Sequence, residues 1–470
     1  MINKLLELKI LPNRKFTPAL TSAAACCLSV VSEDEKFIAS VTEALSLAVD
    51  NVILHGSSSR DYDISLDIYA DDNTLYVELK DTGIPYEFSG TAETQKIMET
   101  VNDFKLSYGR EFGRSQLMTF AFNEALPPFE AENHDNETAV TDVQIRLRDT
   151  VPSDFTGVSR SFYRELGFTY FNNAIYNPDD FKKYISREDY HSLTAETEDG
   201  MFAGLHMLKS WDNIPDVYEG GTAITSPLVR KCGAFSRLMD ANNDYFEHVV
   251  AKGVQISEAV TAHDITQKTR LKYGYTPCGF AFNQHSADEY KNSFQTYDGR
   301  ATTALSCHVI DHSPKEIFVP AEVTHVLDVI YEGENLPRTY HTDAAAITLE
   351  KTVVEASISK DIYCPVIIIR SVGNDYEDVI SDIIYRLKKC ERDMAYVYLC
   401  VEHPGVIEFY ETLKKTGFRF CGLVPNTGYG DLMLIENPIT SLINYDSIVT
   451  TGSFTDMLNM IREFDPDYRK

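Results

Sequence analysis

Residues 220–280 constrain the fold of this chain more than any other stretch. Three short apolar runs alternate there with two segments whose apolar residues recur at helical spacing. The expected strands are 222–225, 254–260 and 275–280, and the expected helices begin near Phe235 and end at Gly274. Strands that alternate with helices in this way predict a mixed α/β (α+β) fold.

The first turn of this stretch brings a cation to the start of a helix. A helix N-terminus offers free backbone N–H groups and the positive end of the helix dipole, and an arginine beside it adds charge. Such a loop suits a pyrophosphate. The candidate cofactor-binding residues are Arg230, Lys231, Cys232, Gly233, Ala234 and Phe235.

In its order of elements, and in the spacing of Arg230 and Gly233, the chain resembles the acyl-CoA-binding core of the GNAT superfamily of N-acetyltransferases. The resemblance implies acetyl-CoA or another acyl-CoA as cofactor, and transfer of its acyl group to an amine. Phe235 stands where the family's loop has a small residue. Arg270 stands where many members have a tyrosine acid, and arginine stabilises a thiolate electrostatically but cannot give up a proton at neutral pH.

Acyl transfer to an amine requires a group that accepts the amine's proton. The candidate catalytic residues are Glu219, on the expected central strand 217–225, and Glu258 and His263, near the end of the next strand. Two alternatives stay open from the sequence alone. In the first alternative, Glu219 is a solvated charge at the end of a strand and has no catalytic role. In the second, His263 caps the helix that follows it.

A motif near the end of this stretch recurs later in the chain. Lys272, Gly274, Tyr275, Cys278 and Gly279 are matched by Lys415, Gly417, Phe418, Cys421 and Gly422, an offset of 143 residues from Gly274 to Gly417. An offset of this size indicates a duplicated domain rather than a solenoid. The second copy lacks the Arg-x-x-Gly loop, so we expect it to be degenerate and to shape the substrate cleft of the first.

The N-terminal segment shows a helical pattern over 33–55 and a hairpin of alternating residues over 62–80. A helix that carries Asn51, followed by a hairpin and the Asp81-x-Gly83 motif, resembles the anti-sigma-factor branch of the GHKL ATP-binding domains. The resemblance implies ATP or ADP with Mg²⁺. Asn51 would be the metal ligand, Asp81 the acceptor for the adenine amino group, and Gly83 the residue that lets the base approach. Leu47 stands where the family has its general base, so ATPase or kinase activity is not expected.

The net charge and the cysteine content of the chain limit its possible partners and its compartment. The chain has 470 residues and a formal net charge of −28, which argues against nonspecific binding to nucleic acid or to anionic membrane. None of its 9 cysteines forms a CxxC pair, so we expect reduced thiols in a cytoplasmic protein. The apolar patch at 23–31 is about half the length that a membrane span needs.

The sequence therefore predicts a nucleotide-binding domain at 1–140, an acyltransferase domain at 141–298 and a degenerate copy at 299–470. Two functions remain open. The first is an acyl-CoA-dependent N-acyltransferase that acts on a small-molecule or protein amine and is regulated by the first domain. The second is a non-catalytic, anti-sigma-like binding protein that engages a regulatory partner and uses the two GNAT-like modules as scaffold. Assembly as a homodimer is also left open.

Overall fold

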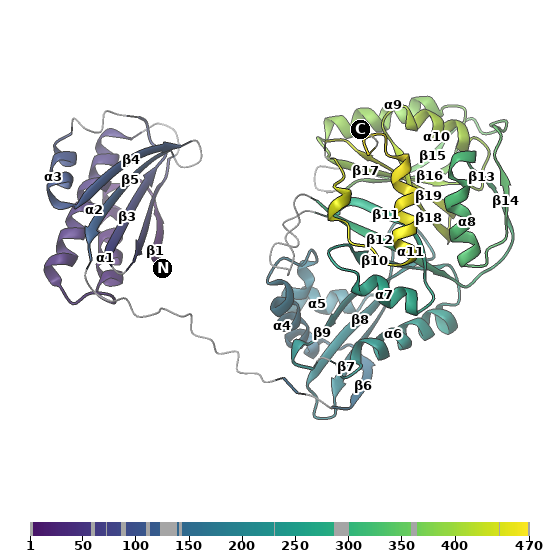
Figure 1. Ribbon diagram of the computed structural model, residues 1–470, viewed down its shortest axis with the longest axis horizontal. Helices are drawn as coiled ribbons and strands as arrows, with labels where there is room; N and C mark the ends of the chain where they lie inside the picture. Colours follow the sequence, from purple (N-terminus) through teal and green to yellow (C-terminus); the bar gives the residue numbers. More distant parts are fainter. Residues whose placement is uncertain are drawn as a thin grey trace. The chain divides into compact units, whose positions relative to one another are not determined.

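The chain divides into two compact units, Met1–Asn136 and Glu137–Lys470, and each is described by itself (Figure 1). The computed structural model describes residues 3–57, 62–71, 73–85, 91–109, 113–122, 139–140, 143–229, 231–285, 300–358, 364–440 and 442–468.

Unit 1 is an antiparallel sheet with helices packed on one face (Figure 1). Its five strands run in the order β1-β2-β3-β5-β4. They are β1 (Asn3–Ile10), β2 (Ile64–Ala70), β3 (Thr74–Asp81), β4 (Asp103–Gly109) and β5 (Gly113–Ala121), with helices α1 (Thr17–Leu28), α2 (Glu35–His55) and α3 (Ala92–Thr100). The helix and the hairpin expected from the sequence are confirmed in α2, β2 and β3.

Helix α2 forms the centre of the unit 1 core. Asp34 accepts hydrogen bonds from the backbone N–H groups of Lys36 and Phe37 and so starts the helix. By length and composition α2 could cross a membrane. In the structure its apolar face, which includes Val41, Leu45 and Val52, is buried against the sheet and α1.

Unit 2 begins with seven strands in the order β6-β7-β8-β9-β10-β12-β11. These strands are β6 (Ile145–Asp149), β7 (Tyr190–Thr197), β8 (Phe202–Ser210), β9 (Val217–Thr225), β10 (Val254–Val260), β11 (Thr276–His285) and β12 (Ala301–Val309). The helices among them are α4 (Phe155–Leu166), α5 (Pro178–Ile185), α6 (Ala234–Tyr245) and α7 (Ile265–Lys272). Strand β12 follows the boundary expected at 299 and lies between β10 and β11, so this sheet continues through Val309.

The second half of unit 2 contributes five strands in the order β15-β16-β17-β19-β18. They are β15 (Val353–Ser357), β16 (Val366–Ser371), β17 (Met394–Cys400), β18 (Arg419–Thr427) and β19 (Gly430–Pro438). Its helices are α8 (Thr324–Gly333), α9 (Tyr376–Lys389), α10 (Val406–Lys414) and α11 (Ser453–Ile461). A separate parallel pair joins β13 (Lys315–Phe318) to β14 (Arg338–His341).

The strands of the two halves form one 12-stranded sheet, and the halves join within it at one pair of residues. Strand β11 pairs with β18 only at Gly279 and Gly422, the glycines of the repeated motif. A Cβ on Gly279 would lie 2.7 Å from the Cα of Gly422, and a Cβ on Gly422 would lie 2.6 Å from the Cα of Gly279. Only glycine lets the two backbones approach this closely. Each glycine also follows a bulge in its own strand.

The same pairings recur on both sides of this joint. From Gly279, the register across β12 leads to Glu258 on β10. From Gly422, the register across β19 leads to Tyr398 on β17. Beyond these, β10 is parallel to β9 and β17 is parallel to β16. Glu258 and Tyr398 therefore occupy equivalent positions in the two halves.

One hydrophobic core runs through both halves. It extends from Ile214 and Val217 in the first sheet to Leu432 and Ile435 in the second, and it includes residues of α8 and α11 such as Ile330. Helices α8 and α11 both pack on β11 and β18, over the joint. The halves of unit 2 thus share a core.

We expect substitution of Gly279 by alanine to lower the free energy of unfolding by about 3 kcal/mol, because the added Cβ would overlap the β18 backbone and the residue has a φ of 153°. Gly200, with a φ of 86° and no atom within 4 Å of an added Cβ, is the matched control, and Gly200→Ala should cost about 1 kcal/mol. Urea denaturation measures both losses. Equal losses would show that the joint is not tightly packed.

Candidate functional site

The central strands of the first sheet part after a short parallel ladder. Strand β9 pairs with β10 at three positions only, and the last pair is Glu219 with Ile256. Beyond that point β9 stays paired with β8 as far as Thr225, and β10 stays paired with β12 as far as Val260. Thr222 has a φ of 50° at the bulge opposite β8. A gap between β9 and β10 therefore opens just after Glu219.

Two carboxylates share one face of the sheet at this gap. Glu258 lies two residues beyond Ile256, the partner of Glu219, and side chains alternate between the faces of a strand. Lys209 on β8 holds Glu219, with its Nζ 3.1 Å from Glu219 Oε1. The geometry brings these two sequence-predicted residues together, whereas nothing in the local sequence pointed to Lys209.

Glu258 is poised to exchange a proton near neutral pH. Burial, and then the charge of Glu219, raise the pKa of Glu258 to about 7. Its one hydrogen bond among the described residues is long, 3.5 Å from Gln284 Nε2 to Glu258 Oε2. A carboxylate with such a pKa and free lone pairs is suited to act as a general base.

The opposite face of the gap carries buried polar side chains. Arg270 on α7 donates from Nη2 to the carbonyl oxygen of Gly220 at 2.8 Å, the residue at which β9 leaves β10. A Cβ on Gly220 would lie 3.1 Å from Arg270 Nη2, so a larger residue would displace the guanidinium. Burial lowers the pKa of Arg270. Arginine still remains charged, and no carboxylate lies in ion-pair contact with Arg270 in the described part of the chain.

Three buried polar atoms around this gap lack a hydrogen-bond partner: Arg270 Nη1, His206 Nε2 and Gln255 Oε1. Asn242 contacts His206 Nδ1 at 2.7 Å. Burial, together with Arg270 and Lys209, lowers the pKa of His206 to about 3, so its imidazole is neutral. Buried polar groups are nearly always satisfied, so these atoms indicate a place for a polar ligand or water.

The expected anion-binding loop precedes α6. Gly233 has a φ of 79° and is the N-cap residue, and Ala234 begins the helix. Lys231 has a φ of 66° and is exposed, and the Cys232 thiol contacts the carbonyl oxygen of Val229 at 2.8 Å. Arg230 lies outside the described residues.

Phe235 and His263 have other surroundings. Phe235, the departure from the family's loop, turns its ring edge-on toward His206, with the ring centroids 6.2 Å apart. His263 is half-buried after the end of β10, and its Nδ1 has no hydrogen-bond partner. Among the described residues, no hydrogen bond or ion pair joins His263 to Glu219 or Glu258. The structure thus groups the two glutamates, and a catalytic role of His263 stays a prediction.

The second half of unit 2 has no matching pair of carboxylates. Glu258 corresponds to Tyr398, and one strand further out Glu219 corresponds to Val366, by the same register across the joint. Valine cannot accept a proton, and tyrosine is uncharged at neutral pH. The chemistry available at the gap of the first half is therefore missing from the equivalent place in the second.

In unit 1 the acceptor expected for adenine is already occupied. Asp81 accepts from Arg114 Nε at 3.0 Å and from Arg114 Nη2 at 2.6 Å, and both side chains are buried. Gly83 N–H also donates to Asp81 at 3.1 Å. A Cβ on Gly83 would lie 2.3 Å from the carbonyl oxygen of Gly56, so this glycine is required by close backbone packing. Neither residue is an open contact for a purine.

Asn51 is likewise enclosed. It is fully buried and donates from Nδ2 to Thr94 Oγ1 at 2.9 Å, while its Oδ1 has no partner. No group of three or more His, Cys, Asp or Glu side chains that could hold a metal ion occurs among the described residues. The expected Mg²⁺ contact therefore has no supporting carboxylate cluster in that part of the chain.

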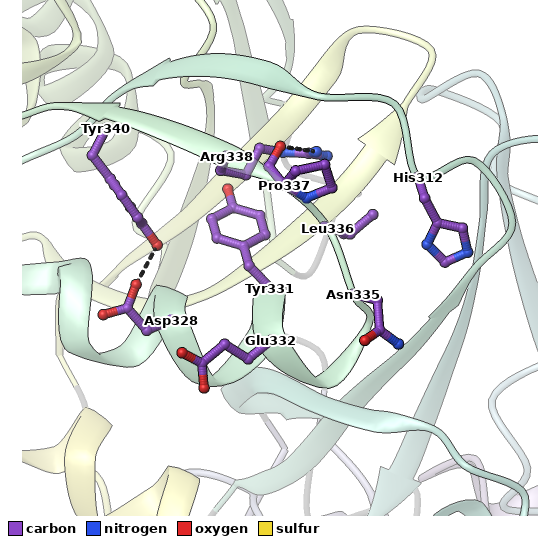
Figure 2. Close-up of a pocket in the computed structure, with 9 residues that line it drawn as sticks. All are labelled: His312, Asp328, Tyr331, Glu332, Asn335, Leu336, Pro337, Arg338 and Tyr340. Carbon is purple, nitrogen blue, oxygen red and sulfur yellow. Dashed lines mark hydrogen bonds between the residues drawn. The ribbon is translucent and has the colours of Figure 1, made fainter.

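A surface pocket of about 630 Å³ lies between α8 and β14 (Figure 2). Two of its polar side chains, Tyr340 and Arg338, are bonded to other side chains of the protein. Tyr340 donates to Asp328 at 2.8 Å, and the Arg338 guanidinium is held by Asp431, with 2.7 Å between Nε and Oδ2, and by Asn426. None of the residues predicted from the sequence lines this pocket.

No protein-family model matches the chain, and no curated protein matches it in sequence. Solved structures similar in fold include an N-acetyltransferase from Staphylococcus aureus Mu50, at 12% identity and a TM-score of 0.30, with 36% of this chain and 99% of that chain covered. A spermidine N-acetyltransferase from Vibrio cholerae gives 14% identity and a TM-score of 0.29, with 35% and 92% covered. Each of these alignments covers about a third of this chain. Neither structure provides evidence for a nucleotide-binding unit 1 or for a second acyltransferase copy, and both stay predictions.

Removal of Arg114 should strongly destabilise unit 1, because Asp81 would be left buried without a counter-charge. We expect Arg114→Ala to lower the free energy of unfolding by about 3–5 kcal/mol in urea denaturation. Lys183→Ala, which breaks the exposed pair with Asp180 (3.0 Å), is the control and should change it by about 0.5 kcal/mol. If both variants lost the same amount, the Asp81–Arg114 pair would not stabilise the unit.

Proposed function

We propose that unit 2 is an acyl-CoA-dependent N-acyltransferase and that its reaction takes place in the gap between β9 and β10. The observation that carries the proposal is that these strands part immediately beside two carboxylates of one face, Glu219 and Glu258, one of which has a pKa of about 7. A base with such a pKa, placed where two strands separate, suits proton removal from an attacking nucleophile.

Each group at the gap has a role in this reaction. The amine nitrogen attacks the thioester carbonyl carbon, the carbon–sulfur bond breaks, and the sulfur leaves with the bonding electron pair. Glu258 accepts the proton that the nitrogen loses. Glu219, whose Oε1 lies 3.1 Å from Lys209 Nζ, helps to hold the amine beside Glu258. Backbone N–H groups of β9 that no longer face β10 are the donors we expect for the oxyanion.

The residues on the other side of the gap fit the anionic cofactor. Lys231, Gly233 and the first amides of α6 offer a cation and free N–H groups for phosphates, and we include Arg230 with them on its sequence position. Arg270 brings a buried positive charge with one unpartnered nitrogen to the apex of the gap. Because no carboxylate among the described residues neutralises the Arg270 guanidinium, its positive charge can stabilise the departing thiolate.

For unit 1 we infer a role that does not require a bound nucleotide. The buried Asp81–Arg114 pair uses both carboxylate oxygens that would recognise adenine. The same observation favours the second candidate function, a protein-binding module, for this unit alone. Regulation of unit 2 would then come through a partner of unit 1 rather than through ATP or ADP.

The proposal is tested by incubating the purified full chain with acetyl-CoA and a panel of amines, and by measuring thiol release together with the mass of each product. We expect acetylated product with at least one amine, and thermal stabilisation by acetyl-CoA but not by adenosine. If the chain showed neither turnover nor stabilisation by acetyl-CoA, the proposed acyltransferase function would be excluded. If the chain then co-purified with a stoichiometric partner, the non-catalytic binding protein would be the better description.

The proposed base makes the reaction depend on pH. Glu258 must be deprotonated to accept a proton, so kcat/KM should fall as the pH drops below about 7. We expect Glu258→Gln to lower kcat/KM by about 10²–10⁴-fold and to remove this dependence. Glu411→Gln, at an exposed glutamate of α10, should leave both unchanged. A wild-type profile that stays flat through neutral pH would exclude Glu258 as the base.

A further inference from the structure

The turn between β8 and β9 is fixed against the second half of unit 2. The Trp211 ring stacks on Tyr398 of β17, with ring centroids 6.2 Å apart and planes at 29°. Gly428, in the turn between β18 and β19, donates from its N–H to the carbonyl oxygen of Pro215 at 2.7 Å. A Cβ on Gly428 would lie 2.6 Å from the Cβ of Pro215. The two halves therefore meet a second time, away from the glycine joint.

This second contact brings Tyr398 near the carboxylate of Glu258. The β18 backbone passes close to β12 and β10 as well as β11, so the second sheet faces the strand that carries Glu258. Burial raises the pKa of Tyr398, and the charge of Glu258 raises it further. A phenol of one half therefore lies within electrostatic range of a carboxylate of the other.

The Tyr398 hydroxyl remains available for a ligand. Among the described residues it makes no hydrogen bond, although its side chain is only 8% exposed. Tyr396, two residues earlier on β17, behaves differently, because its hydroxyl donates to the carbonyl oxygen of Phe282. Tyr396 is therefore committed to the fold, whereas Tyr398 has an unused hydrogen-bonding group beside Glu258.

Aromatic rings also approach Glu258 from the first half. The charge of His285 acts on Glu258, and the ring of His285 lies 5.9 Å from that of Phe171. Phe171 is 55% exposed and contacts Tyr170 at 4.6 Å between ring centroids. A large aromatic side chain that is half exposed in this way is suited to contact an apolar ligand.

We propose that Tyr398 and Trp211 form the wall of the acceptor pocket opposite Glu258, so that the second half of unit 2 selects the acyl acceptor. The ligand that this pocket would take is an amine carried on a flat, apolar group. The ammonium end meets Glu219 and Glu258, and the apolar end lies against the aromatic rings. This inference rests on the proposed acyltransferase function.

The test compares acceptor selectivity in the full-length wild type and its Tyr398→Ala, Tyr398→Phe and Trp211→Leu variants. The probes are a phenylalkylamine and a short alkylamine of similar basicity, with acetyl-CoA as donor. Tyr398→Ala should raise KM for the phenylalkylamine about 10-fold relative to the alkylamine and leave KM for acetyl-CoA unchanged. Tyr398→Phe, which keeps the ring, should retain part of the selectivity. Trp211→Leu should resemble Tyr398→Ala.

Two controls separate this inference from other effects. Tyr385→Ala, at an exposed tyrosine of α9, should change neither KM nor selectivity. The Tm of each variant detects a loss of folding. Equal changes for both amines in both the Tyr398→Ala and Trp211→Leu variants would overturn the assignment of the wall while leaving the acyltransferase intact. Absence of transfer to any amine by the wild-type chain would overturn the proposed function itself, and this inference with it.

Discussion

The early end of the ladder between β9 and β10 is the feature on which the rest of unit 2 depends. Three pairs hold the strands parallel, and beyond Glu219 each strand follows its other neighbour. Arg270 donates a hydrogen bond to the carbonyl oxygen of Gly220 at the point where the strands separate. In the described part of the chain, no carboxylate lies in ion-pair contact with its buried guanidinium. The cost of burying that charge is offset when an anionic ligand enters, which gives the gap a physical reason to bind one.

The second half of unit 2 is joined closely to the half that carries the gap. Gly279 and Gly422 let the two backbones touch, and α8 and α11 cover the joint. The β18 strand also lies close to β10 and β12, and Trp211 of the first half stacks on Tyr398 of the second. At the places of Glu219 and Glu258 this half has Val366 and Tyr398, so we propose that it contributes aromatic surface rather than a base.

Much of the fold could be predicted from local patterns, because the helix at 33–55, the central strand at 217–225 and the repeated Cys-Gly motif each follow from neighbouring residues. The pattern did not show that the two glycines touch, since that contact joins residues far apart in the sequence. The Asp81 motif predicted an open acceptor, and Arg114, 33 residues later, fills it. Of the candidate bases, Glu219 and Glu258 were found from their strands, but Lys209 and Tyr398 come from other strands and gave no local signal. Arg230 lies outside the described residues, so its role stays a prediction.

The most direct test of the gap as the acyl site is a crystal structure of the full chain with a non-hydrolysable thioether analogue of acetyl-CoA. We expect the acyl group to lie between residues 220–222 of β9 and Glu258 of β10, with the phosphates at the start of α6. An analogue bound elsewhere, or a gap closed by packed side chains at saturating ligand, would contradict it.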